Sequence, residues 1–131
     1  MPNANGCELV RVFTRRVGSP IADDTIKSNE AFQVVLQAEV GQTLHNTGGA
    51  YNLSIVVKDE TAGNIINNAA QAGNFKDVNW PNLDLEFAFP NIAAQGAAKQ
   101  DHLYRVIAVL RAGAGDPIMD WAETYLLITP P

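Results

Sequence analysis

Hydrophobic and polar residues alternate with a period of two in several stretches of this chain. The pattern is clearest in residues 32–40, 51–58 and 83–89, where every second residue is apolar and most residues between them are polar. Alternation with this period is typical of a strand that buries one face and exposes the other. These stretches therefore predict three strands, each with one face in a core.

Three further stretches are rich in β-branched, aromatic and leucine side chains. Residues 9–15 predict an edge strand, and residues 103–111 and 122–129 predict two more strands. The glycine-rich segment 112–117 is typical of a loop that joins the last two strands as a hairpin, because glycine adopts positive φ without strain. Two prolines end the final strand.

Two segments rich in Ala, Asn and Gly leave alternatives open. Residues 61–79 fit either a short helix around residues 65–72 or one weak strand and a loop, and residues 91–100 fit a helical turn. Six or seven short strands separated by turn residues predict an all-β fold, a two-sheet antiparallel β-sandwich with one or two short helical turns in the long loops. An open α+β sheet is the alternative if both segments are helices. The length of 131 residues predicts a single domain, 1–131.

Composition and charge narrow the classes of function. Hydrophobic residues make up 47% of the chain, enough for a core, and no apolar run is long enough for a membrane span. The net charge of −5 disfavours nucleic acid as a partner, because phosphate contacts need clustered Lys and Arg. The single cysteine, Cys7, rules out an internal disulfide, and the first residues do not read as a signal peptide. We therefore expect a protein that is cytoplasmic or part of a larger soluble assembly.

One predicted strand carries a family resemblance. Tyr104 stands near its start, and the apolar residues Val106, Ala108 and Leu110 alternate after it. This pattern resembles the penultimate strand of immunoglobulin-like and fibronectin type III-like domains, in which a tyrosine packs at a corner, and the resemblance implies an immunoglobulin-like sandwich. Val106 stands where an immunoglobulin domain has its second cysteine, and residues 51–58 lack that family's buried tryptophan. The resemblance therefore implies an architecture and no activity.

Residues suited to catalysis or metal binding are scattered along the sequence. His45, His102 and Cys7 lack the short spacings of a zinc site and the local context of a nucleophile with its base. The acidic residues also lack the alternating oxygen ligands of a calcium loop, and turn chemistry explains them better. They pair only at Asp23-Asp24, at Asp59-Glu60, and at Asp116 with Asp120. We therefore expect no catalytic residue, no metal and no cofactor.

The outward side of one predicted sheet is unusually apolar. If residues 51–58, 103–111 and 122–129 share a sheet and Tyr104 points inward, then Val56, Ile107 and Val109 point outward. The last strand adds one of two sets, Trp121, Tyr125 and Leu127 or Thr124, Leu126 and Ile128. A solvated sheet face is normally polar, and a contiguous apolar patch usually marks a partner contact. The alternative is that an Ala-rich segment folds over this face.

Three kinds of function fit these features and stay open at this point. The leading hypothesis is a non-enzymatic interaction or assembly module that binds a protein partner or a second copy of itself through Val56, Ile107, Val109, Trp121 and Tyr125. A second is a carbohydrate-binding or small-ligand-binding module with Trp80, Trp121 and Tyr51 around one end, although Trp80 beside a proline also suits a core. A third is an enzyme that pairs His102 with the adjacent Asp101.

Overall fold

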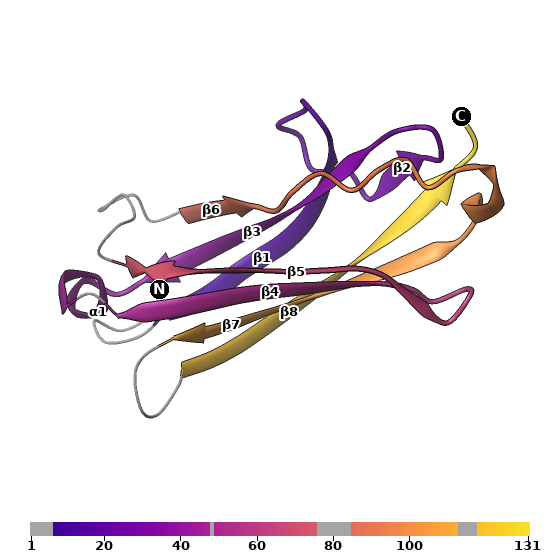
Figure 1. Cartoon of the computed structure of the whole chain (residues 1–131). Coiled ribbons are helices and arrows are strands. Elements are labelled where there is room, and N and C mark those ends of the chain that lie inside the picture. The colour runs from indigo at the N-terminus through magenta and orange to yellow at the C-terminus, as the bar shows by residue number, and fades with distance from the viewer. Residues whose placement is uncertain (1–6, 48, 76–84, 113–117) are drawn as a thin grey trace.

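Two sheets make up the fold, as the alternating pattern predicts. The computed structural model describes residues 7–47, 49–75, 85–112 and 118–131. The three-stranded sheet has the order β1 (Cys7–Arg16), β3 (Phe32–Val40), β6 (Leu85–Ala88). The five-stranded sheet has the order β2 (Thr25–Lys27), β8 (Ile118–Thr129), β7 (Leu103–Ala112), β4 (Ala50–Asp59), β5 (Asn64–Asn74). The sheets stack as two layers (Figure 1). The chain is an all-β sandwich, and its strand arrangement is consistent with the immunoglobulin-like architecture.

Alternation along the strands builds one core between the two layers. In β7, Tyr104, Val106, Ala108 and Leu110 are buried and the residues between them are not. The same pattern holds in β4, so each strand contributes every second side chain to a shared apolar interior. The other large contributors are Phe32, Val34 and Leu36 from β3, Leu53, Ile55 and Val57 from β4, and Leu126 and Ile128 from β8.

The two Ala-rich segments, for which the sequence leaves helix and strand open, form different elements in the structure. Residues 64–74 form strand β5, which pairs antiparallel with β4, so the open α+β alternative is excluded. Residues 97–99 form the 3₁₀ turn η2 (Ala97–Lys99), as expected for the second segment. Two elements were not predicted: the short helix α1 (Gln42–Thr47) and strand β2, which pairs parallel with β8 in an otherwise antiparallel sandwich.

Tyr104 is the largest of the fully buried side chains in the core. Its side chain is fully buried, and its hydroxyl donates a hydrogen bond to Gln95 Oε1 at 2.8 Å. Burial, helped by the nearby Asp59 carboxylate, raises the pKa of Tyr104 to about 12, so the hydroxyl stays a donor over the usual pH range. The bond ties the segment before η2 to the start of β7.

We expect Tyr104→Phe to lower the free energy of unfolding by about 1 kcal/mol, because the variant keeps the ring but loses this bond. Urea unfolding followed by circular dichroism measures the change. Tyr125→Phe is the matched control, since Tyr125 is 46% exposed and the wild-type stability should be retained. Equal losses in both variants would show that the Gln95 contact contributes nothing specific.

Candidate functional site

The five residues predicted to bind a partner lie together on the outer side of the five-stranded sheet. Val56 is directly opposite Ile107 on the neighbouring strand, and Val109 is directly opposite Trp121. On β8 the outward set is Trp121, Tyr125 and Leu127, because Leu126 and Ile128 are buried in the core. We define the apolar face as the outward apolar side chains of β4, β7 and β8: Val56, Leu103, Ile107, Val109, Met119, Trp121, Tyr125 and Leu127.

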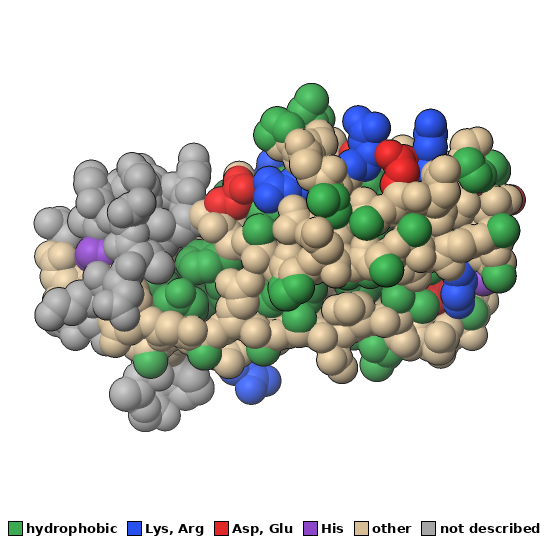
Figure 2. Space-filling model, turned by 45° about the horizontal axis from the view of Figure 1, so that its top comes forward, with side chains coloured by type: hydrophobic (Ala, Val, Ile, Leu, Met, Phe, Trp, Pro, Cys, Tyr) green, Lys and Arg blue, Asp and Glu red, His purple; other side chains and the backbone are tan. Residues whose placement is uncertain are grey.

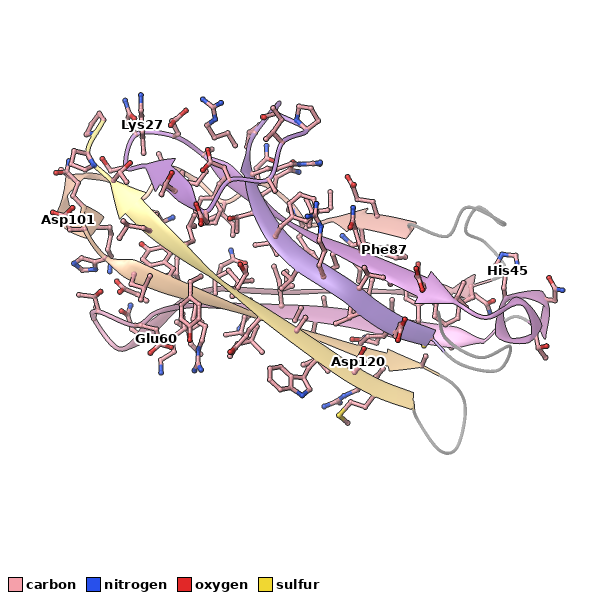
Figure 3. All side chains as sticks on the ribbon, turned by 180° about the vertical axis from the view of Figure 1, so that it is seen from behind. Lys27, His45, Glu60, Phe87, Asp101 and Asp120 are labelled. Atoms are coloured by element: carbon pink, nitrogen blue, oxygen red, sulfur yellow. The ribbon has the colours of Figure 1, made fainter. Side chains whose placement is uncertain are left out.

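Large side chains of the apolar face reach into solvent. Trp121 is 62% exposed, Met119 60% and Tyr125 46%, while Ile107 and Val109 are half-buried between them. Side chains of β7 and β8 project away from the five-stranded sheet, with Glu60 toward one end and Asp120 toward the other (Figure 3). The described parts of the two Ala-rich segments do not cover Met119, Trp121 and Tyr125, since these side chains stay exposed and β5 is part of the same sheet.

Charged side chains beside and within the apolar face pair with each other. Arg105 Nε lies 2.9 Å from Glu60 Oε1, and Arg105 Nη1 lies 3.8 Å from Glu123 Oε2. Lys58 Nζ lies 3.8 Å from the same Glu60 oxygen. The ion pairs are partly exposed and so add little stability. Arg105 is directly opposite Tyr125 and Glu123 is directly opposite Ile107, so these ion pairs lie among the apolar side chains of the face.

The outer side of the three-stranded sheet has the opposite character. Arg11 Nε donates to Gln37 Oε1 at 2.9 Å, and Arg15 bridges Gln33 and Glu86 at 3.3 and 3.0 Å. The Arg11 guanidinium also lies 4.2 Å from the centre of the Phe13 ring and shields it from solvent. This side is polar and internally bonded, so the apolar character belongs to one face of the sandwich alone.

The structure does not bring the residues of the carbohydrate hypothesis onto one surface. Tyr51 points to the inner side of the sheet, where its ring packs 4.8 Å from Phe75 and 5.5 Å from Phe87, centre to centre. It also lies over Gly73, where a Cβ atom would come within 2.6 Å of its hydroxyl. Trp121 is on the outer side, and Trp80 lies outside the described residues. Trp121 and Tyr125 lie on the same side of β8, four residues apart, and are the exposed aromatic pair that remains.

His102 pairs with Asp59, and the adjacent Asp101 is not its partner. His102 Nδ1 lies 2.7 Å from Asp59 Oδ2, and Lys99 Nζ donates to the same oxygen at 3.0 Å. The Ala62 N–H donates to Asp59 Oδ1 at 3.0 Å. The cluster joins the η2 turn to the β4–β5 hairpin, and no hydroxyl or thiol of a described residue is hydrogen-bonded to His102. Its geometry is that of a structural tie between two loops.

Cys7, Asp120 and His45 have contacts that fit structural roles. Cys7 is buried, and burial together with Asp120 raises the pKa of its thiol to about 11, so it stays protonated and a poor nucleophile. Asp120 Oδ2 accepts a hydrogen bond from the Leu9 N–H at 2.9 Å. His45 is buried in α1 with Asn46 Oδ1 3.3 Å from its Nδ1. Asp116 lies outside the described residues.

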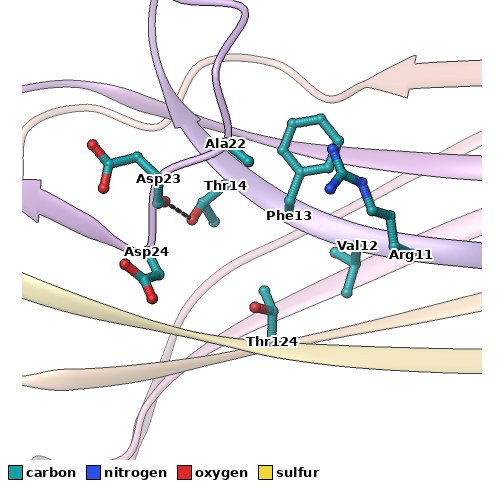
Figure 4. A pocket seen from close by; sticks show the side chains of 8 residues that line it. All are labelled: Arg11, Val12, Phe13, Thr14, Ala22, Asp23, Asp24 and Thr124. Atoms are coloured by element: carbon teal, nitrogen blue, oxygen red, sulfur yellow. Dashed lines mark hydrogen bonds between the residues drawn. The ribbon is translucent and has the colours of Figure 1, made fainter.

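A cleft of about 400 Å³ opens between β1, the segment before β2, and β8. Its lining includes Arg11, Phe13, Thr14, Asp23 and Thr124 (Figure 4). The Thr14 hydroxyl donates to the Asp23 carbonyl at 2.6 Å, and the Asp23 carboxylate accepts from the N–H and hydroxyl of Thr25 at 3.0 Å. These bonds are those of a turn, as expected for the acidic pairs.

The described residues hold no group of three or more His, Cys, Asp or Glu side chains that could bind a metal ion. No helix among them is both long and apolar enough to cross a lipid bilayer.

Comparisons with known proteins identify the fold. No protein-family model and no curated protein sequence matches the chain. Among solved structures, it is similar to a Bacteroides fragilis protein described as a β-galactosidase, with a TM-score of 0.61 and 10% identity. A Bacteroides cellulosilyticus member of glycosyl hydrolase family 2 gives 0.59 and 13%, and a Bacteroides uniformis β-glucuronidase gives 0.57 and 10%. Each match covers 93% of this chain but only 14–17% of the other. At this identity the likeness shows a shared sandwich fold.

The Asp59 cluster predicts a specific acid sensitivity. Burial raises the pKa of Asp59, but hydrogen bonds from His102, the Ala62 N–H and Lys99 lower it by more, so the pKa is about 2 instead of 3.8. A carboxyl whose pKa is lower in the folded chain contributes stability above its unfolded value and loses it as the pH falls through the folded value. We therefore expect the urea midpoint to fall between pH 4 and pH 2, and to fall less steeply in Asp59→Asn.

The exposed carboxyl of Asp24 provides the control for this experiment. Asp24→Asn should keep the steep pH dependence of the wild type. If Asp59→Asn also keeps it, the acid sensitivity comes from other carboxyls and the tie has no role in it.

Proposed function

We propose that the chain is a non-enzymatic interaction module whose apolar face is covered by another protein surface. The observation that carries the proposal is the exposure of Trp121, Met119 and Tyr125 around the half-buried Ile107 and Val109. Fully burying a side chain of this size contributes roughly 1.5–3 kcal/mol before the entropic cost of association. A partner that covers several of these side chains therefore has enough apolar area to bind.

The composition of the face also favours a protein as the partner. Aromatic residues and Met are enriched at protein interfaces, and Trp and Tyr are common among the residues that dominate binding energy. Arg105 and Glu123 lie among these side chains, opposite Tyr125 and Ile107, and they pair with each other, while Arg105 also pairs with Glu60. A partner that covers the face therefore also covers these ion pairs, which provide directional contacts.

The structural comparisons support a role within a larger assembly. In the three solved proteins compared above, the matching sandwich occupies 14–17% of a much longer chain. A domain within a longer chain commonly forms an interface with its neighbours, and an apolar sheet face suits such an interface. We propose that the apolar face here has the same kind of use, against another domain or another protein.

Photo-crosslinking tests the proposal directly. We expect a chain with benzoylphenylalanine in place of Val109 to form a defined adduct in the cells that naturally make it, because Val109 lies at the centre of the face. Mass spectrometry identifies the attached protein. Adding Ile107→Lys should reduce the adduct at least tenfold, since a buried unpaired charge opposes binding.

Val17 provides a matched position outside the face, because it is also an exposed valine but follows β1 of the other sheet. Benzoylphenylalanine there should give only scattered, weak adducts. Equal adduct yields at positions 17 and 109 would overturn the proposal.

Carbohydrate binding is the alternative function, and the exposed pair Trp121 and Tyr125 favours it. Two solved proteins of similar fold are described as a β-galactosidase and a β-glucuronidase. If a sugar ring stacks on Trp121, its indole N–H resonance should shift saturably on titration with a β-galactoside or β-glucuronide, and Tyr125→Ala should weaken the shift. No shift at high sugar concentration would exclude this use of the pair.

A further inference from the structure

Strand β5 forms a long edge of the five-stranded sheet that pairs on one side only. It runs from Asn64 to Asn74, pairs with β4, and has no second neighbour in the sheet order. Its sequence, NIINNAAQAGN, contains no charged residue and no proline. Natural sheets usually protect an edge of this length with lysine, proline, bulges or a covering segment, because an open edge pairs with other strands.

The direction of the backbone groups on β5 follows from one hydrogen bond. The Phe75 N–H donates to the Gly49 carbonyl at 2.9 Å, next to the first pair of the β4–β5 ladder. Because backbone groups alternate in direction along an antiparallel strand, Gly73, Gln71 and Ala69 face β4. Asn68, Ala70 and Ala72 therefore direct their N–H and carbonyl groups away from the sheet, and their side chains are exposed.

The other strand edges in the described part of the chain are short or are occupied at some of their backbone groups. On β1, the Leu9 N–H is bonded to Asp120 and the Thr14 carbonyl accepts from the Asp23 N–H. On β8, the Leu127 N–H is bonded to the Asp24 carbonyl at 2.9 Å. Strand β6 has only four residues, and the Ala88 carbonyl accepts from the Gln71 side chain at 2.8 Å. The outer edge of β5 combines length with an uncharged sequence, and it has no neighbouring strand in the described part of the chain.

We infer that two copies of the chain pair antiparallel through β5, about a two-fold axis close to Ala70. This arrangement sets Ala70 opposite Ala70 and Asn68 opposite Ala72, so that outward N–H groups of one copy meet outward carbonyls of the other. The contact is between an edge and an edge, and it does not depend on the proposed function of the apolar face.

Charge explains why a second copy fits this edge. The chain carries a net charge of −5, so two copies repel each other wherever charged surfaces meet. Across β5 every facing pair is uncharged, and the outward side chains at 68, 70 and 72 are small enough for close strand approach. In the space-filling view, blue and red side chains gather mainly along the top, with blue groups also at the right and at the lower edge, and the surface between them is mostly tan and green (Figure 2).

The pairing would also join the two apolar faces. An axis perpendicular to the sheet keeps the outer sides of both copies on the same side of one continuous sheet. Asn68, Ala70 and Ala72 would then separate two copies of the Val56 and Ile107 row. The dimer would present a double apolar surface to whatever protein covers it.

Sedimentation velocity across a concentration series, from low micromolar to about millimolar, tests the pairing. We expect reversible dimerisation in the wild type and a dissociation constant at least tenfold higher in Ala70→Pro. Proline removes an N–H that faces away from β4 and so leaves the ladder within the chain intact. Ala70→Ser is the matched control and should dimerise like the wild type. A wild type that stays monomeric throughout would overturn the inference.

Two further measurements keep the result decisive. If Ala70→Pro unfolds, the double variant Asn68→Lys/Ala72→Lys is used in its place. Both sites are exposed, and the axis sets each lysine of one copy opposite a lysine of the other, so the two copies should repel each other. Hydrogen exchange provides a positional readout: the amides of Asn68, Ala70 and Ala72 should become protected only as the dimer forms, and those of Ala69 and Gln71 at all concentrations. A dimer that leaves residues 68, 70 and 72 unprotected would contradict pairing through β5.

The double variant Ile107→Lys/Val109→Lys distinguishes pairing through β5 from contact through the apolar face. The variant should dimerise normally through β5 and lose only the contact of the apolar face. If it loses the dimer while Ala70→Pro keeps it, the copies meet through the face and the β5 inference is wrong.

Discussion

The position of β7 between β4 and β8 is the constraint on which the rest of the molecule depends. Burial of Tyr104, Val106, Ala108 and Leu110 determines the register of all three strands, because their inward side chains fill a common core. The same period of two places Ile107 on the opposite side. A slip of one residue would exchange the two sets and expose the core. The apolar outer face is therefore a property of the register that stabilises the fold, and its composition calls for an explanation beyond folding.

The two outer sides of the sandwich differ in whether their side chains find partners within the chain. On the three-stranded sheet, Arg11 and Arg15 bond with Gln37, Gln33 and Glu86, so these polar side chains find their hydrogen-bond partners within the chain. On the five-stranded sheet, large aromatic and aliphatic side chains stand in solvent. Asp120 and Asp23 occupy backbone groups of β1, while β5 is left open. The chain thus protects one side of the sandwich and leaves a face and an edge of the other available for contacts.

Local patterns predicted most of the fold, and contacts between distant residues account for what was missed. Strands β3, β4 and β6 were predicted because alternation is visible within a few residues, and β7 because it is rich in β-branched and aromatic side chains. Strand β5 was left open, since Ala and Asn distinguish strand from helix poorly. The partner of His102 was missed because Asp59 is 43 residues away and only the β4–β5 hairpin brings it near. The outward set on β8 was left as two alternatives, and pairing with β7 decides it.

Oxidation by hydroxyl radicals, read out by mass spectrometry, tests most directly whether the apolar face is covered by another protein. Trp121, Met119 and Tyr125 are reactive toward such radicals, and all three are exposed in the isolated chain. The account predicts fast oxidation of these residues in dilute purified protein and strong protection in a native extract, with Val17 oxidised equally in both. Equal oxidation of the face in the two samples would show that it stands free, and would contradict the account.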